Sequence, residues 1–340
     1  MKNGIAIAGN LIVDYVKLID TYPDPGMLCS IISRAQSVGG CAANTLGCIA
    51  AMDPKVKLSC HGCIGDDEAG DFIMAFLKQN GIETRGVKVK AGNMTSFTDV
   101  MTVKETGART FFQARGANAV FGMEDLDFEA IGCCDMFHIG YALLLDQFDR
   151  EDNEYGTLMA RTLKRIQELG VKTSMDVVSE DSERFSRIVK PSLRYCNYFI
   201  ANEIEGGKVA GIKPRSHKGI LDRDALLEIC QKLMEYGVSE LVVLHAPEGG
   251  IYLDRCGNHG FVPSLKLPKG YIKGSVGAGD AFCAGILYSL YQEYPIEEAM
   301  MIANGAAAAN LSAVDSVSGL CSVKGLRKLI ERYTEEGEAI

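Results

Sequence analysis

A turn of small residues followed by an acid is the part of this chain best suited to chemistry. Gly277, Ala278, Gly279 and Asp280 stand shortly before the apolar run 286–290, and this order predicts a helix with open backbone N–H groups at its start. Such a helix start favours an anion, phosphate in particular. A carboxylate beside a phosphate costs energy because the two negative charges repel. Its presence is explained if it accepts the proton of a hydroxyl that attacks the phosphorus. The pattern therefore predicts phosphoryl transfer.

A plainer interpretation of this stretch is a glycine-rich helix start in which Asp280 is an ordinary first-turn acid. Short glycine motifs are weak signals when they stand alone. The elements that position Asp280, and the motifs elsewhere in the chain, must decide between the two interpretations.

Most of the chain alternates short buried strands with helices. Apolar runs predict strands at 4–9, 57–59, 136–139, 173–176, 198–201 and 241–244. Apolar residues at helical spacing predict helices at 42–51, 71–79, 155–169, 223–236, 279–291 and 296–311. This alternation predicts an α/β fold with a mainly parallel central sheet that is covered on both faces.

Two segments break the alternation. Residues 27–38 and 97–113 have the pattern of strands without helices, and the second carries turn residues at Glu105, Thr106 and Gly107. A small sheet packed over the mouth of the main sheet would act as a lid. We therefore expect a single α/β domain over 1–340, with lid strands inserted at about 15–38 and 95–116.

Asp14 follows the first predicted strand. In an open parallel sheet, ligands bind beyond the carboxyl ends of the strands. This rule places Asp14 and the turn at 277–280 at the same edge of the sheet, where we expect one cleft. Taken alone, Asp14 also suits a simple turn at the end of a strand.

The composition is that of a soluble globular protein. The chain has 340 residues, of which 47% are hydrophobic, enough for a sizeable core. Its formal charge of −9, from 35 basic and 44 acidic residues, argues against a general nucleic-acid or acidic-membrane binder. No apolar run approaches the roughly 18 to 20 residues that span a bilayer, and no signal-peptide core precedes the first strand. We expect a cytoplasmic protein.

The twelve cysteines are dispersed, many of them inside apolar runs. This distribution favours buried thiols over disulfides. Cys60 and Cys63 have the C-x-x-C spacing of half a zinc site, which Cys133 and Cys134 would complete, but the chain has no second spaced pair.

Several separate motifs occur along the chain in order. They lie at Gly39, Gly40 and Asn44; at Gly62, Gly65, Asp67 and Gly70; at Gly116, Ala117 and Asn118; at Asn202 and Glu205; and at Gly277, Ala278, Gly279 and Asp280. In these motifs, from Gly4 to Gly319, the chain resembles the ribokinase-like (PfkB-type) family of sugar and nucleoside kinases. The resemblance implies a ribokinase-like three-layer sandwich with a small β-strand lid.

The resemblance also implies ATP-dependent phosphorylation of a hydroxyl group, foremost the primary alcohol of a sugar. Asp280 would be the general base, and the N–H groups of Gly277, Ala278 and Gly279 would form the anion hole. The residues that bind the substrate whose hydroxyl is phosphorylated would be Asp14, Gly39, Gly40, Asn44 and Asn118.

The same resemblance assigns the nucleotide side of the site. Asn202 and Glu205 would act near Mg²⁺ and the nucleotide phosphates, with Glu205 holding the ion through water because Mg²⁺ dehydrates reluctantly. Gly249 matches the glycine of the nucleotide loop, and Asn304 falls at the adenine pocket.

Several of these residues have structural alternatives. Asn44 also suits the first turns of a helix. Asn202 and Glu205 have the spacing of a capping box, a role that is compatible with nucleotide binding. Asn304 on an alanine-rich helix also suits packing or a place in solvent.

The chain departs from the family pattern at two places. Gly274, Ser275 and Val276 replace the usual Asp-Thr-Thr, and loss of that acid leaves a K⁺ requirement open. The usual nucleotide-loop threonine is replaced near His245, so the preference for ATP over another triphosphate is open as well. His245 is either a nucleotide contact or a plain loop histidine.

The alternatives to a sugar kinase differ in class. A nucleoside kinase would use the same scaffold, and a sugar-phosphate kinase would need a cationic clamp such as Arg109 and Arg115. A non-catalytic sugar- or nucleotide-binding regulator would keep the fold without the chemistry. A dinucleotide dehydrogenase is disfavoured because Gly9-Asn10-Leu11 lacks the G-x-G-x-x-G pattern.

The acceptor itself cannot be identified from these patterns, including whether it already carries a phosphate. The exposed edges of the lid strands and the family resemblance predict a homodimer paired through the lid.

Overall fold

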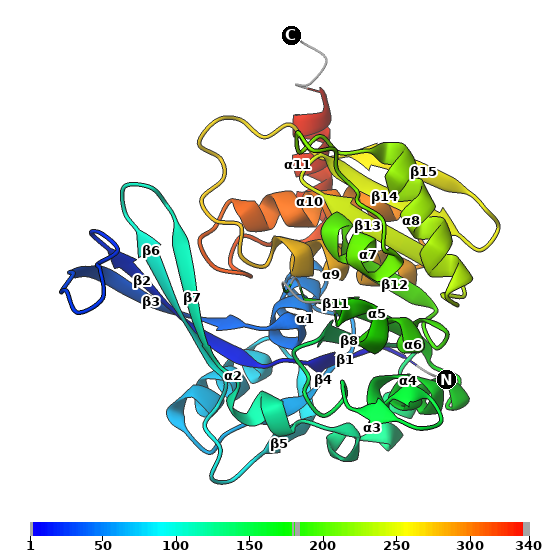
Figure 1. Cartoon of the computed structure of the whole chain (residues 1–340), viewed down its shortest axis with the longest axis horizontal. Helices are drawn as coiled ribbons and strands as arrows, with labels where there is room; N and C mark the ends of the chain where they lie inside the picture. The colour runs from blue at the N-terminus through cyan, green and yellow to red at the C-terminus, as the bar shows by residue number, and fades with distance from the viewer. Residues whose placement is uncertain (1–2, 179, 181–183, 336–340) are drawn as a thin grey trace.

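A nine-stranded sheet forms the centre of the molecule (Figure 1). The structure is a computed structural model that describes residues 3–178, 180 and 184–335. The strand order is β15-β14-β13-β12-β11-β8-β1-β4-β5. The strands from β5 through β13 in this order run parallel, and β14 and β15 run antiparallel beside them. The strand bounds are β1 Ile5–Gly9, β4 Leu58–Ile64, β5 Glu83–Val89, β8 Met136–Ala142, β11 Lys172–Val177, β12 Tyr198–Asn202, β13 Leu241–Ala246, β14 Gly249–Asp254 and β15 His259–Pro263.

Helices cover both faces of this sheet. Along β1, Ile5 and Ile7 point into one apolar cluster while Ala6 and Ala8 point into the other. The first cluster packs against α1 (Cys41–Met52), α2 (Glu68–Gln79), α9 (Ala278–Tyr291), α10 (Ile296–Leu311) and α11 (Val323–Glu335). The second packs against α3 (Phe128–Gly132), α4 (Leu158–Glu168), α5 (Phe185–Ile188), α6 (Lys190–Leu193), α7 (Glu203–Ala210) and α8 (Arg223–Glu235). The result is a three-layer α/β sandwich.

A separate four-stranded sheet, in the order β3-β2-β6-β7, projects to the left of the body in Figure 1. Its strands are β2 (Ile12–Ile19), β3 (Ile31–Gly39), β6 (Phe97–Val103) and β7 (Arg109–Ala114). The strand patterns within 27–38 and 97–113 correspond to β3, β6 and β7. The segment with Asp14 differs from the prediction, because the chain leaves β1 and enters β2 after only two residues. Asp14 therefore lies inside a strand and not in a turn.

The predicted helices all form, with small shifts at their ends. The helix predicted over 155–169 begins later, at Leu158, because Gly156–Thr157 form the short strand β10 with β9 (Glu151–Asp152). Thr157 then caps α4, since its hydroxyl accepts a hydrogen bond from Ala160 N at 3.1 Å. Two short 3₁₀ helices, η1 (Gly116–Val120) and η2 (Met123–Asp125), follow β7. Within the described residues, no helix has both the length and the apolar character needed to cross a membrane.

Candidate active site

Asp280 lies in the first turn of α9, whose start is shaped by Gly277. Gly277 has φ 78°, a left-handed conformation that suits glycine. A Cβ at this position would come within 2.6 Å of the side chain of Ser316. The glycine therefore allows the chain to turn tightly into the helix and directs Asp280 toward the sheet edge.

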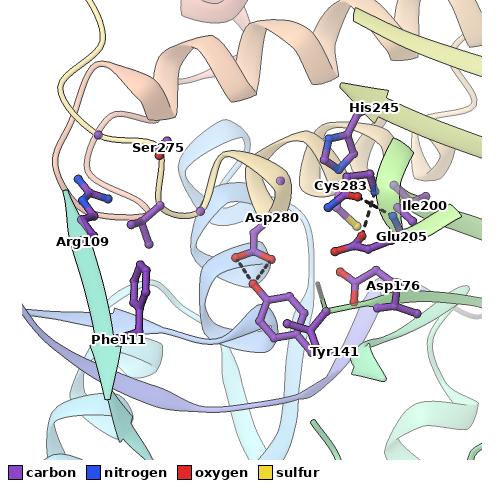
Figure 2. Close-up of a pocket in the computed structure, with 18 of the residues that line it drawn as sticks. Arg109, Phe111, Tyr141, Asp176, Ile200, Glu205, His245, Ser275, Asp280 and Cys283 are labelled. Atoms are coloured by element: carbon purple, nitrogen blue, oxygen red, sulfur yellow. Dashed lines mark hydrogen bonds between the residues drawn. The ribbon is translucent and has the colours of Figure 1, made fainter. Parts of the chain in front are cut away.

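The carboxylate of Asp280 is buried and receives two side-chain hydrogen-bond donors, of which Figure 2 shows Tyr141. Asn44 Nδ2 donates to Oδ2 at 2.7 Å, and the Tyr141 hydroxyl lies 2.8 Å from each carboxylate oxygen. Burial and, to a lesser extent, the nearby Asp176 raise the pKa of Asp280 to about 7, while the two donors oppose the rise. A carboxylate with a pKa near neutrality suits a general base.

The start of α9 presents backbone N–H groups beside this carboxylate. The first helical hydrogen bond runs from Ala281 N to Gly277 O at 2.8 Å, so the earlier amides are outside the i to i−4 ladder. Among them, Ala278 N lies 3.4 Å from Ser275 O, a long and weak hydrogen bond. The predicted anion hole thus occupies a helix start that can receive a phosphoryl group.

A cavity of about 890 Å³ opens beside Asp280, and we call it the larger cavity. Its wall combines residues from β7, the ends of β8, β11, β12 and β13, and the loop before α9. Figure 2 shows Arg109 and Phe111 on β7 across the cavity from Asp176. The carboxyl ends of the parallel strands therefore do form one cleft with the turn at 277–280, as the edge rule predicts.

A second cavity, of about 680 Å³, lies on the other side of the α9 start, and we call it the smaller cavity. Its wall is mainly apolar and includes Phe282, Ala307 and Leu311. Asn304 lines it and also donates through Nδ2 to Pro263 O at 3.0 Å. The two cavities share a set of wall residues: Asn202, His245, Ile272, Ser275 and Gly279.

Asn202 and Glu205 form the capping box that their spacing predicts. Glu205 N donates to Asn202 Oδ1 at 2.8 Å, and Asn202 N donates to Glu205 Oε2 at 3.0 Å, which fixes the start of α7. Both residues also line the larger cavity. The capping-box interpretation is therefore correct for Asn202 and Glu205. The same geometry leaves both side chains on the wall of the larger cavity.

Asp14, Gly39 and Gly40 meet where the small sheet joins α1. A Cβ at Gly39 would overlap the Asp14 carboxylate, so the missing side chain makes room for the acid. Burial raises the pKa of Asp14 to about 6, and a hydrogen bond with Thr98 opposes the rise. Gly40 has φ 84° and lies against Asn10 O, where any Cβ would overlap. These residues do not belong to the wall of the larger cavity.

Two residues that were predicted to bind the sugar substrate have other hydrogen-bond partners in the structure. Asn44 donates to Asp280, so it orients that carboxylate. Asn118 holds the backbone of Leu11, accepting from Leu11 N at 3.2 Å and donating to Leu11 O at 3.1 Å. The side chain of Asn118 is therefore occupied in joining η1 to the segment between β1 and β2. Gly249, predicted at the nucleotide loop, starts β14 and lines neither cavity.

Tyr141 and Asp176 line the larger cavity, and the sequence patterns did not single out either of them. Tyr141 lies in β8, two residues after the strand predicted to end at Ile139, and Asp176 ends another predicted strand. The rule that ligands bind at the carboxyl ends of strands would have found both. His245 lies in β13 and not in a loop, and burial lowers its pKa to about 4, so it is neutral at pH 7.

The half zinc site proposed for the C-x-x-C spacing does not form. Cys60 and Cys63 lie on β4, where side chains alternate between the faces of the sheet. Cys60 packs in one apolar cluster and Cys63 in the other, so the two thiols cannot converge on one ion. Buried thiols are the correct interpretation for this pair.

Comparisons with known proteins match most of the chain. A family model described as pfkB family carbohydrate kinase matches residues 6–320. Fructokinase-1 of Zea mays is 24% identical over 335 residues, which cover 95% of this chain and 96% of that protein.

Solved structures share the fold over almost the whole chain. A ribokinase from Thermotoga maritima has a TM-score of 0.79 at 20% identity and covers 97% of this chain and 99% of its own. A ribokinase from Arabidopsis thaliana, complexed with ribose and ATP, has a TM-score of 0.78 at 18% identity, with the same coverage. The predicted ribokinase-like fold is confirmed.

Proposed function

Because the chain belongs to the pfkB family of carbohydrate kinases, we propose that it transfers the γ-phosphoryl group of ATP to a hydroxyl of a sugar, with Asp280 as general base. One observation carries the proposal: a buried carboxylate with a pKa of about 7 lies at a helix start, beside a wall that two cavities share. In this arrangement the larger cavity would hold the acceptor and the smaller cavity the nucleotide, with Asp280 on the wall of the larger cavity.

The acceptor would occupy the larger cavity, with its attacking hydroxyl at Asp280. Asp280 takes the proton as the oxygen attacks the phosphorus in line, and the amides at the start of α9 stabilise the charge on the transferred group. Asn44 and Tyr141 keep the carboxylate in place. A positioned base of this kind contributes about 10²- to 10⁴-fold to the rate.

The nucleotide base would occupy the smaller cavity. Its apolar wall suits a planar ring, and Asn304 supplies a polar group there. The shared wall at Ser275, Gly279 and His245 would then face the phosphates. His245 is neutral at pH 7, so it brings no charge to them.

Mg²⁺ fits the oxygen atoms that this wall offers. The ion prefers carboxylate, carbonyl and water oxygens, and Glu205 supplies a buried carboxylate on the wall of the larger cavity, held at the α7 start by Asn202. When bound, Mg²⁺ neutralises charge on the phosphates. Glu205 would hold it through water.

A nucleoside is the second candidate acceptor, and Phe111 is the observation that favours it. An aromatic ring on β7 at the wall of the larger cavity can stack on a base as well as on a sugar face. A sugar phosphate is less favoured than the sequence pattern suggests. Arg115 is paired with Asp146 at 2.9 Å and lies outside the cavity wall, which leaves Arg109 from the predicted clamp.

ADP release from Mg-ATP against a panel of free sugars, nucleosides and sugar phosphates tests the proposal. We expect one class of free sugar to exceed every nucleoside by at least about tenfold in kcat/KM. Higher kcat/KM with nucleosides would establish the second candidate. ATP binding without ADP release for any acceptor would overturn both and indicate a regulator.

A further inference from the structure

Three potential metal ligands from distant parts of the chain meet beneath the larger cavity. Cys41 begins α1, His138 lies in β8 and Asp176 lies in β11. Cys41 Sγ lies 3.6 Å from His138 Nε2 and 3.6 Å from Asp176 Oδ2. The third separation, His138 Nε2 to Asp176 Oδ2, is also 3.6 Å. The three donor atoms therefore form a nearly equilateral triangle.

This triangle has the size of one face of a tetrahedral zinc site. Zinc binds cysteine sulfur at about 2.3 Å and histidine nitrogen at about 2.0–2.1 Å, so a tetrahedral angle separates the two donors by about 3.6 Å. For nitrogen and carboxylate oxygen the same construction gives about 3.4 Å. The observed separations agree with these values to within a few tenths of an ångström.

The surroundings orient the ligands as a metal requires. His138 Nδ1 lies 3.0 Å from Ser174 Oγ, so the hydroxyl can accept the Nδ1 proton and leave the lone pair of Nε2 facing Cys41 and Asp176. Gly140, on β8, leaves the space in which the side chains of Cys41 and Asp176 meet. A Cβ there would overlap both the Cys41 sulfur and an oxygen of Asp176.

The charge balance of the cluster also favours a divalent cation. All three side chains are buried, and no lysine or arginine among the described residues forms an ion pair with Asp176. Its Oδ1 atom is buried without a hydrogen-bond partner. One thiolate, one carboxylate and a neutral imidazole around a divalent ion carry no net charge, which reduces the cost of burying the carboxylate.

We propose that Cys41, His138 and Asp176 form a binding site for a thiophilic divalent ion, with Zn²⁺ as the best fit. Binding replaces the proton of the Cys41 thiol, which passes to solvent. Asp176 and the neighbouring Cys283 line the larger cavity, which gives the ion a route in and a fourth position for water. The site is distinct from the proposed Mg²⁺ position at Glu205.

Metal binding to the whole enzyme tests the site directly. We would titrate the nucleotide-free protein, in excess Mg²⁺, with Co²⁺ and measure the sulfur-to-cobalt charge-transfer band, and determine Zn²⁺ per chain by elemental analysis after dialysis. We expect one ion per chain and at least about tenfold weaker binding in Cys41→Ser and in Asp176→Asn. Cys196→Ser is the matched control, since Cys196 is fully buried and its thiol donates to Ser192 O.

The proposal is overturned if the wild type shows no charge-transfer band, or if Cys41→Ser binds as tightly as Cys196→Ser. Asp176→Asn keeps the thiol and the shape of the side chain, so it decides the matter if Cys41→Ser fails to fold. Because the readout is metal content, failure here leaves the proposed kinase activity untouched.

Discussion

At the scale of single residues, the site depends on how a buried carboxylate is held. No lysine or arginine among the described residues forms an ion pair with Asp280, and its charge is stabilised by Asn44 and Tyr141. Burial raises its pKa and these donors lower it, so the working value reflects a balance. Changing one donor should therefore change the pH at which the enzyme works.

Tyr141→Phe removes a donor to Asp280 and should raise the pKa of this carboxyl. A base must be deprotonated to act, so activity is lost as pH falls through its pKa. We expect the acidic limb of the kcat/KM profile, near pH 7 in the wild type, to move to higher pH by about 1 unit.

Tyr155→Phe is the control for this change, because Tyr155 lines neither cavity. An acidic limb that stays in place in Tyr141→Phe would show that the Tyr141 hydroxyl does not set the pKa of Asp280.

The sequence predicted the residues that have a local pattern and missed those that do not. Gly277 and Asp280 stand in one short motif, so their placement at a helix start was predictable. Tyr141 reaches Asp280 from 139 positions away, and its contact exists only because β8 and α9 meet in the folded chain. Cys41 and His138 have no spacing typical of a metal site, for the same reason.

At the scale of elements, α1 links the small sheet to the base. Gly40 precedes the helix with a positive φ of 84° and lies against the carbonyl of Asn10, and Asn44 follows one turn later to reach Asp280. The direction of the helix and the position of the amide are therefore set by one glycine.

Gly40→Ala should disturb both the fold and the site. The added methyl group overlaps Asn10 O and the backbone disfavours φ 84°. We expect a loss of about 2–4 kcal/mol in the free energy of unfolding, measured by urea denaturation, together with a lower kcat.

Gly81→Ala provides a matched control. Gly81 has φ 70°, but no atom lies within 4 Å of the place that an added methyl group would take, so only the backbone cost of about 1 kcal/mol applies. Equal losses in the two variants would contradict the role of the Asn10 contact.

The elements themselves were largely predictable where the pattern was long or fully apolar. β1 is buried throughout and was predicted almost to the residue, whereas β14 begins with two glycines and was not recognised as a strand. β2 lies only partly inside the predicted lid segment 15–38, and its first residues were not recognised as a strand because Asp14 interrupts the apolar pattern. Gly39 makes room for that half-buried acid across the β2–β3 pair. Tertiary contacts decide such cases.

At the scale of the whole molecule, the small sheet leaves two edge strands and several apolar side chains in solvent. β3 and β7 are its edges, and the exposed apolar residues on and near them are Met27, Leu28, Ile31, Ile32, Phe111 and Phe112. Exposed edges and apolar patches favour association with another chain. The role of this sheet as a lid and the homodimer both stay predictions.

Light scattering tests the dimer. We expect a mass near twice the 36.8 kDa of one chain, and a shift to monomer in Ile32→Lys, because a buried lysine at the edge strand would carry an unpaired charge. Ile220→Lys is the control, since Ile220 is 65% exposed and lies outside the small sheet. A wild-type mass near that of one chain at working concentration would rule the dimer out.

Turnover by Asp280→Asn is the most direct test of the central claim, that Asp280 is the base of a phosphoryl transfer. The substitution keeps the shape of the side chain and removes a buried charge, so thermal unfolding at pH 8 should show a folded protein. With the acceptor identified from the panel, we predict that kcat falls by about 10²- to 10⁴-fold while the Kd values for ATP and acceptor change little. A variant with near-normal kcat would contradict the account and remove Asp280 from the mechanism.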